Sequence, residues 1–150
     1  MALKIIDKGW KKILKAAKAV DGKAIAVGID ESARYEDGTP VAEVGYIHEN
    51  GLGVPQRPFM VELHDKTRDT QGKISRDVAT LDSPAQIERE LERGANELER
   101  EYKDKFHTLK LKPLAETTIS RKGSAQVLVE TGDLSASFKG KVVEASDAAG

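Results

Sequence analysis

The first 20 residues place apolar side chains at intervals of three and four, which is the spacing of one face of an α-helix. Lysines occupy the other side, and Gly22 follows where such a helix would end. The pattern therefore predicts an amphipathic helix over residues 3–20. Its apolar stripe consists of Leu3, Ile6, Trp10, Ile13, Ala17 and Val20.

A short apolar run predicts a β-strand at residues 23–29. Residues 30–40 are rich in turn formers and contain the pair Asp37-Gly38, so we expect a hairpin loop there. Residues 41–46 fit either the returning strand or the start of a short helix, and the pattern does not separate these two.

Pro58 suits the first turn of a second helix, in which Phe59 and Leu63 supply apolar side chains, while residues 51–55 indicate a loop before it. Residues 66–82 are mostly polar, with Gly72 in their middle. We expect this segment either to continue the helix weakly or to be mobile.

A third helix is predicted to begin at Ser83 as N-cap, with Pro84 in its first position. Its apolar side chains keep a period near 3.6 up to Phe106. A short strand is indicated at residues 127–129. Residues 134–143 alternate between apolar and polar, which predicts a final strand from Leu134 with a bulge at Gly140. Residues 144–150 are expected to fray.

These elements predict one α+β domain over residues 1–150. We expect a small, mostly antiparallel sheet packed with a long N-terminal helix and one or two further helices. No internal repeat divides the chain.

Composition narrows the classes of function. Basic and acidic side chains number 24 and 25 among 150 residues, so the formal net charge is -1. A dedicated nucleic-acid-binding domain is usually basic, and this balance argues against one. The chain has no cysteine, which excludes disulfides, thiolate metal sites and a cysteine nucleophile. No apolar run approaches the roughly 18 residues of a membrane span, so we expect no membrane segment.

The histidines are the candidates for metal chemistry. His48 precedes Glu49, but position 52 is leucine, so the two-histidine zinc-protease motif is absent. A metal hydrolase that uses His48, Glu49 and His107, with His64 as a further candidate, is the less favoured alternative. The competing interpretation is that His48 packs at a turn and hydrogen-bonds the backbone. We expect no catalytic residue, metal or cofactor.

Lysines line one face of the predicted N-terminal helix, while the third helix is net acidic. Such faces could pair within one chain or between identical subunits in a ring. The basic face could instead contact DNA nonspecifically as it passes through a channel, or it could make the chain a nonspecific DNA-binding module, which is the first alternative function. A solvated amphipathic face is the plainest interpretation. The basic face consists of Lys4, Lys8, Lys11, Lys15 and Lys18.

Two segments carry more specific patterns. The first is Tyr-Ile-His-Glu-Asn-Gly at residues 46–51, followed by Val-Pro-Gln-Arg-Pro-Phe at residues 54–59. The second is Leu-Val-Glu-Thr-Gly-Asp-Leu-Ser-Ala-Ser-Phe at residues 128–138. In this order they resemble the tailed-phage virion morphogenesis family, whose members are called tail completion or head–tail joining proteins. Gln56 and Phe138 depart from the residues that the family often has, without disturbing the loop or the apolar pattern.

The resemblance marks a set of motif residues that we expect to stabilise a loop-to-helix junction and a turn-to-strand junction, not to catalyse. Pro55 and Pro58 would fix the entry into the second helix. Arg57 could bind the carboxylate of Glu49, and Phe59 would anchor the helix in the core. The motif residues are His48, Glu49, Gly51, Pro55, Arg57, Pro58, Phe59, Thr131, Gly132, Leu134 and Ser137.

The resemblance implies a structural protein of the phage neck. Such a protein would form a ring, with six copies to match the symmetry of the tail, between the head connector or stopper protein and the tail tube or tail terminator protein. It would be made in the host cytoplasm and end in the virion. Residues 30–40 and 66–82 are the segments that we expect to order on docking, with charged faces supplying register.

Overall fold

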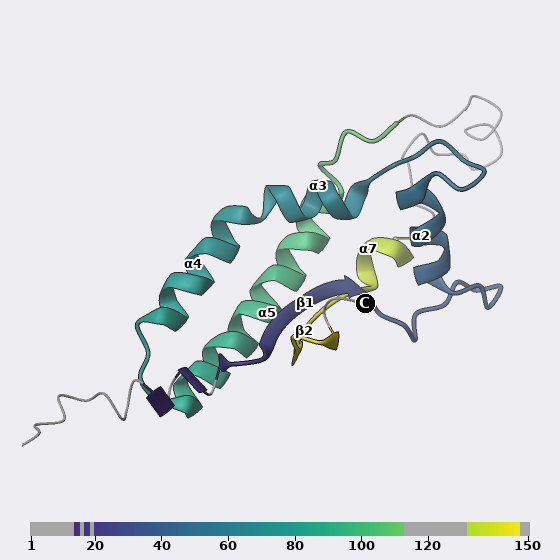
Figure 1. Ribbon diagram of the computed structural model, residues 1–150. Helices are drawn as coiled ribbons and strands as arrows, with labels where there is room; N and C mark the ends of the chain where they lie inside the picture. The colour runs from purple at the N-terminus through teal and green to yellow at the C-terminus, as the bar shows by residue number, and fades with distance from the viewer. Residues whose placement is uncertain (1–13, 16, 19, 113–131, 148–150) are drawn as a thin grey trace, which may run out of the picture.

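The structure is a computed structural model that describes residues 14, 15, 17, 18, 20–112 and 132–147. Figure 1 shows helices α4 and α5 running alongside each other, the sheet lying on α5, and α2 and α7 together at one end. The predicted α+β class is confirmed. In chain order the elements are β1 (Lys23–Ile29), α2 (Val41–Asn50), α3 (Phe59–Lys66), α4 (Arg68–Ala79), α5 (Pro84–Phe106), α7 (Asp133–Ala136) and β2 (Phe138–Glu144).

Within the described residues, the sheet consists of β1 and β2, which pair antiparallel. The register is continuous from Lys23 opposite Glu144 to Ile29 opposite Phe138. Residues 30–40 therefore lead into a helix and do not form the predicted hairpin loop between adjacent strands, because the partner of β1 comes from the far end of the chain.

Gly140 lies directly opposite Val27 in the continuous register, so the predicted bulge at this position is wrong. The glycine has a different purpose, since a Cβ at position 140 would collide with the carbonyl oxygen of Ala95. The absence of a side chain lets the backbone of β2 lie directly on α5.

Glu99 of α5 also holds the sheet on the helix. Its carboxylate accepts a hydrogen bond from the backbone N–H of Gly140 at 3.0 Å and one from the Lys103 ammonium at 2.7 Å. Burial alone would raise the pKa of Glu99, but these hydrogen bonds and the charges of Lys103 and Lys139 outweigh it and lower the pKa. The charged form of Glu99 therefore stabilises the contact between α5 and β2.

The predicted final strand begins later than expected. Residues 133–136 form α7, and β2 starts at Phe138, so Leu134 lies in a helical turn and not in a strand. Leu134 and Phe138 are both buried, and their spacing of four suits a helical turn as well as a strand. The prediction that the chain frays from residue 144 is also wrong for residues 144 and 145. Glu144 pairs with Lys23, and the N–H of Ala145 donates to the carbonyl of Gly22.

The two segments that the pattern left open are helical. Residues 41–50 form α2, which buries Val41 and Gly45, four positions apart. Residues 68–79 form α4, a helix separate from α3 and not a weak continuation of it. Thr67 marks the break, where its hydroxyl donates to the carbonyl of Leu63 at 2.9 Å. Ile74 is the residue that α4 buries.

Aromatic rings from three elements form the centre of the core. Phe59 of α3, Phe106 of α5 and Phe138 of β2 are at most 3% exposed. The centroids of the Phe59 and Phe106 rings lie 5.7 Å apart in an edge-to-face arrangement, and that of Phe138 lies 5.6 Å from Phe106. The same cluster also includes Val41, Leu63, Tyr102 and Leu134.

The described residues among 14–20 are helical, and residues 1–13 of the predicted N-terminal helix lie outside the described part of the chain. The strand predicted at residues 127–129 also lies outside it. Among the described residues, no helix has both the length and the apolar character that crossing a membrane requires.

Candidate functional site

The first sequence motif builds the junction between α2 and α3. The junction begins at Gly51, which ends α2 in the left-handed conformation, with φ of 68°, and donates its N–H to the carbonyl of Ile47. A Cβ at position 51 would lie 2.9 Å from the Cβ of Gln56. Both the turn and the close approach of the following loop therefore require glycine.

Glu49 caps the helix that follows the loop. Its carboxylate accepts hydrogen bonds from the backbone N–H groups of Met60 at 2.9 Å and Val61 at 3.3 Å, in the first turn of α3. The N-cap residue of α3 is Pro58, which has no side-chain hydrogen bond to offer. A carboxylate from α2 thus satisfies N–H groups that α3 leaves unpaired, and its charge suits the positive end of the helix.

Arg57 lies buried in the loop, with 3% of its surface exposed. Its Nε donates to the carbonyl of Lys112 at 3.0 Å, and its Nη1 lies 3.0 Å from Nδ1 of His48 and 3.3 Å from the carbonyl of Pro55. Burial lowers the pKa of the guanidinium. Because a guanidinium only donates, Nδ1 of His48 accepts in this contact.

These partners correct the prediction that Arg57 binds the carboxylate of Glu49. Glu49 is turned toward the backbone of α3, whereas Arg57 joins the end of α2 to the segment after α5. The prediction that His48 hydrogen-bonds the backbone holds for its main chain, whose carbonyl accepts from the N–H of Arg57 at 2.8 Å. The His48 ring contacts the Arg57 side chain.

The second sequence motif meets the first in the core. Phe59, which follows the Arg57-Pro58 pair, is fully buried, which confirms that it anchors the start of its helix. Its ring centroid lies 6.4 Å from that of Phe138, and Leu134 lies in the same cluster. The structure therefore brings together two motifs that stand about 70 residues apart in the sequence.

Gly132 and Ser137 of the second motif lie at the two ends of α7. Gly132 precedes α7 with φ of 78°, and the Ser137 hydroxyl donates to the carbonyl of Leu134 at 2.7 Å. The carbonyl of Ser137 accepts from the N–H of Asp30 at 2.7 Å, which ties this turn to the end of β1. Thr131 lies outside the described residues.

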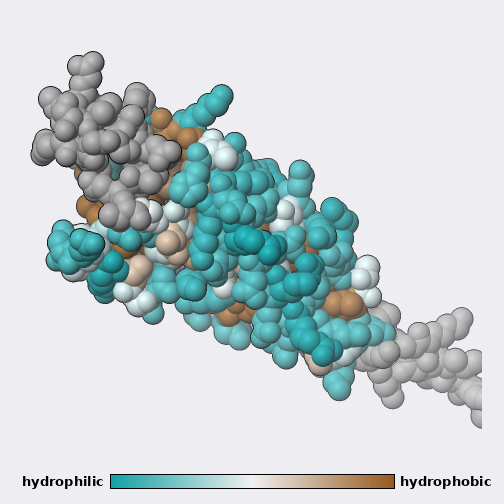
Figure 2. All heavy atoms as spheres, turned by 180° about the vertical axis from the view of Figure 1, so that it is seen from behind, coloured by the Kyte–Doolittle hydropathy of each residue, from teal (hydrophilic) through white to brown (hydrophobic). Residues whose placement is uncertain are grey.

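Three large apolar side chains are exposed around the junction, and the sequence analysis did not single them out. Tyr46 of α2 is 63% exposed, Leu52 of the loop 53%, and Val61 of α3 58%. Figure 2 shows a largely hydrophilic face with hydrophobic atoms gathered toward the end of the molecule where α2 lies. The helical period could have identified two of them, because Tyr46 and Val61 fall outside the buried stripes of their helices.

The residues of the alternative hydrolase site do not come together. His48 contacts Arg57, and Glu49 caps α3. His64 lies on α3, where the side chain of Gln71 donates to its carbonyl at 3.0 Å, and His107 follows the end of α5. Across residues 20–112 and 132–147 and the described part of the first helix, no three His, Asp or Glu side chains are grouped so that they could hold a metal ion.

The lysine face of the N-terminal helix is described only in part. Lys15 and Lys18 are exposed, while Lys4, Lys8 and Lys11 lie outside the described residues. The predicted basic face is therefore accessible at the two positions that can be checked.

The junction contains buried rings, a helix cap supplied by a second helix, and a buried arginine that binds carbonyl groups. Its contacts are those of a structural joint that holds α2, α3 and α7 in fixed positions. Comparisons of the chain with family models, with curated proteins and with solved structures find no match.

Proposed function

We propose that this chain is a structural protein of a tailed-phage neck, which forms a homo-oligomeric ring that completes the tail and joins it to the head connector. The ring would contain six copies, as the resemblance implies. Its role is assembly: it presents a fixed surface to the connector or stopper protein on one side and to the tail tube or terminator protein on the other. DNA passing through the ring would make nonspecific contacts at most.

One observation carries the proposal. The two motifs on which the family resemblance rests converge on a single buried cluster, where Phe59 packs with Leu134 and Phe138. Motif residues of an enzyme would be expected to surround a pocket with polar side chains. Here they support the packing of α2, α3 and α7, which is what a structural family would retain.

The exposed side chains at the junction support a binding role for this end of the molecule. Tyr46, Leu52 and Val61 lie on the elements that Glu49 and Arg57 hold in place. Aromatic and aliphatic side chains on a rigid support are the usual anchors of a protein interface. The junction would therefore set the position of a contact face for a neck partner.

Electron microscopy of a lysate tests the proposal, using a phage whose genome encodes this chain and in which the gene carries an early stop codon. The proposal predicts DNA-filled heads and free tails that are not joined. Fully tailed, infectious particles would reject it.

A further inference from the structure

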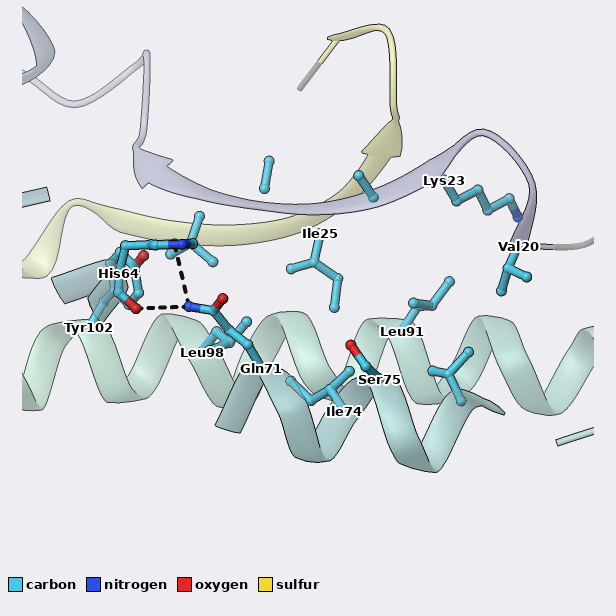
Figure 3. A pocket seen from close by; sticks show the side chains of 14 residues that line it. Val20, Lys23, Ile25, His64, Gln71, Ile74, Ser75, Leu91, Leu98 and Tyr102 are labelled. Carbon is cyan, nitrogen blue, oxygen red and sulfur yellow. Dashed lines mark hydrogen bonds between the residues drawn. The ribbon is translucent and has the colours of Figure 1, made fainter. Parts of the chain in front are cut away.

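A groove of about 620 Å³, lined by both apolar and polar side chains, runs between β1 and α4, with α5 as its floor. Five consecutive residues of β1, from Lys23 to Val27, line it, so it follows the edge of β1 that faces away from β2. In Figure 3, Val20 and Lys23 lie at one end and His64 and Tyr102 at the other. The apolar side chains that line the groove include Val20, Ile25, Ile74, Val78, Leu91 and Leu98.

The same chain carries an apolar helix face that the described residues do not cover. Leu14 is 42% exposed, and Ala17 is exposed as well. The apolar stripe predicted from the sequence continues toward the N-terminus through Ile13, Trp10 and Ile6. The molecule thus has an open groove with apolar side chains in its lining and an amphipathic segment whose apolar face could bind there.

The geometry directs this segment away from its own groove. Only Asp21 and Gly22 separate the helical residues from β1. Figure 1 shows the described residues among 14–20 next to the start of β1, at the end of the molecule opposite α2. Because Val20 lies at one end of the groove, a helix that extended past that end would leave the groove of its own chain.

The segment is long enough to cover the groove. As a helix, residues 1–13 would span about 20 Å at 1.5 Å per residue. The five residues of β1 that line the groove span about 16 Å at roughly 3.3 Å per residue. A helix of this length would place its stripe along most of the groove.

We propose that residues 1–20 of one copy bind as an amphipathic helix in the β1–α4 groove of a second copy, with Trp10 as the buried anchor. The contact is head-to-tail, because the helix of one copy and the groove of the next are different surfaces, and such contacts close into rings or extend into filaments. Its interpretation as the ring contact rests on the proposed function.

The first test uses Trp10, which is the only tryptophan of the chain. Its emission spectrum and its quenching by acrylamide are followed over a range of protein concentrations, together with the mass from light scattering. We expect the emission to shift to the blue and the quenching to fall as the mass rises above that of one chain. A monomer at every concentration would overturn the proposal, and so would a blue-shifted monomer, which would place the helix in its own groove.

Matched substitutions locate the two surfaces. Ser75 is an exposed residue of α4 that lines the groove, so S75R would obstruct the groove and repel the lysines of the incoming helix. Q86R adds the same side chain at an exposed position of α5 that does not line the groove. We expect S75R and W10A each to weaken association about tenfold or more, while Q86R leaves it unchanged.

Mixing the two defective variants gives the sharpest result. W10A retains an intact groove and S75R retains an intact N-terminal segment, so an equimolar mixture should form a dimer of one copy of each. Each variant alone should remain monomeric, with a circular dichroism spectrum like that of the unmodified chain. Association that survives both substitutions, or a mixture that stays monomeric, would overturn the proposal. These measurements use purified protein, whereas the neck function is tested by the morphology of phage particles. Failure of one proposal can therefore be distinguished from failure of the other.

Discussion

The Oε2 atom of Glu49, near the end of α2, accepts a hydrogen bond from the backbone N–H of Met60 in the first turn of α3, at 2.9 Å. A residue of one helix thus supplies the cap that the next helix lacks, because Pro58 stands at the N-cap of α3 and has no polar side chain. This contact connects the end of α2 to the start of α3.

Removing that carboxylate should loosen the junction. We expect E49A to lower the free energy of unfolding by about 1 kcal/mol, the usual cost of losing a helix cap. E43A removes an exposed glutamate from the same helix and should change stability by less than about 0.5 kcal/mol. Urea unfolding of both variants provides the measurement, and equal losses would contradict the capping role.

Substitutions at Gly51 and Gly53 can separate the cost of backbone strain from the cost of a packing collision. Both have positive φ, at 68° and 73°, but a Cβ meets Gln56 only at position 51 and nothing within 4 Å at position 53. G53A should therefore cost only the backbone strain, about 1 kcal/mol, and G51A at least twice as much. Thermal unfolding of the two variants tests this order, and a G53A variant that is the less stable would contradict it.

Gly140 and Gly28 test the contact between the sheet and α5. G140A places a Cβ against the carbonyl of Ala95, whereas G28A in β1 meets nothing within 4 Å. We expect G140A to lose about 3 kcal/mol and G28A to be neutral or slightly more stable, since alanine lowers the entropy of the unfolded chain. Urea midpoints that do not differ between the variants would mean that the strand does not lie on the helix as described.

Glu99 should make stability depend on pH. Its pKa is lowered in the folded protein, because the hydrogen bonds from Lys103 and Gly140 and the charges of Lys103 and Lys139 outweigh the effect of burial. Its contribution is therefore present above the unfolded-state pKa of about 4.5 and is lost as the pH falls through the lower folded-state value. We expect E99Q to be less stable than the unmodified chain by about 1 kcal/mol at pH 7 and the difference to narrow below pH 4. E92Q, at an exposed position of α5, is the control, and a difference for E99Q that stays constant with pH would contradict the assignment.

The elements that could be predicted from the sequence are those with a long or simple pattern. The 23 residues of α5 repeat the helical period through six apolar positions, and β1 is a compact apolar run. The burial of Phe59 also followed from its place after Pro58. In these segments one pattern dominates, so local sequence and tertiary packing agree.

The elements that were missed have patterns that fit two structures. In α4 the one buried residue is Ile74, so the mostly polar sequence of this helix shows little apolar periodicity. The helix is stabilised by packing against α5, which its own sequence does not reveal. In α7 the pair Leu134 and Phe138 suits both a helical turn and alternation. Only the register of β2, fixed by β1 more than 100 residues earlier, decides between them.

The polar contacts of the junction could not be predicted from charge alone. Complementary charges favoured a pair between Glu49 and Arg57, but the unpaired N–H groups at the start of α3 also attract a carboxylate. In the folded chain the carboxylate binds these N–H groups, and Arg57 reaches the carbonyl of Lys112, 55 residues away. Which partner each of these two side chains binds depends on where distant parts of the backbone lie, and no local sequence pattern encodes those positions.

The most direct test of the neck function is to add the purified protein to a lysate from the stop-codon phage and to count joined particles by electron microscopy. The account predicts that heads and tails, separate before the addition, become joined in proportion to the protein added, and that infectivity rises with them. Heads and tails that stay apart when the folded protein is added in excess would contradict it.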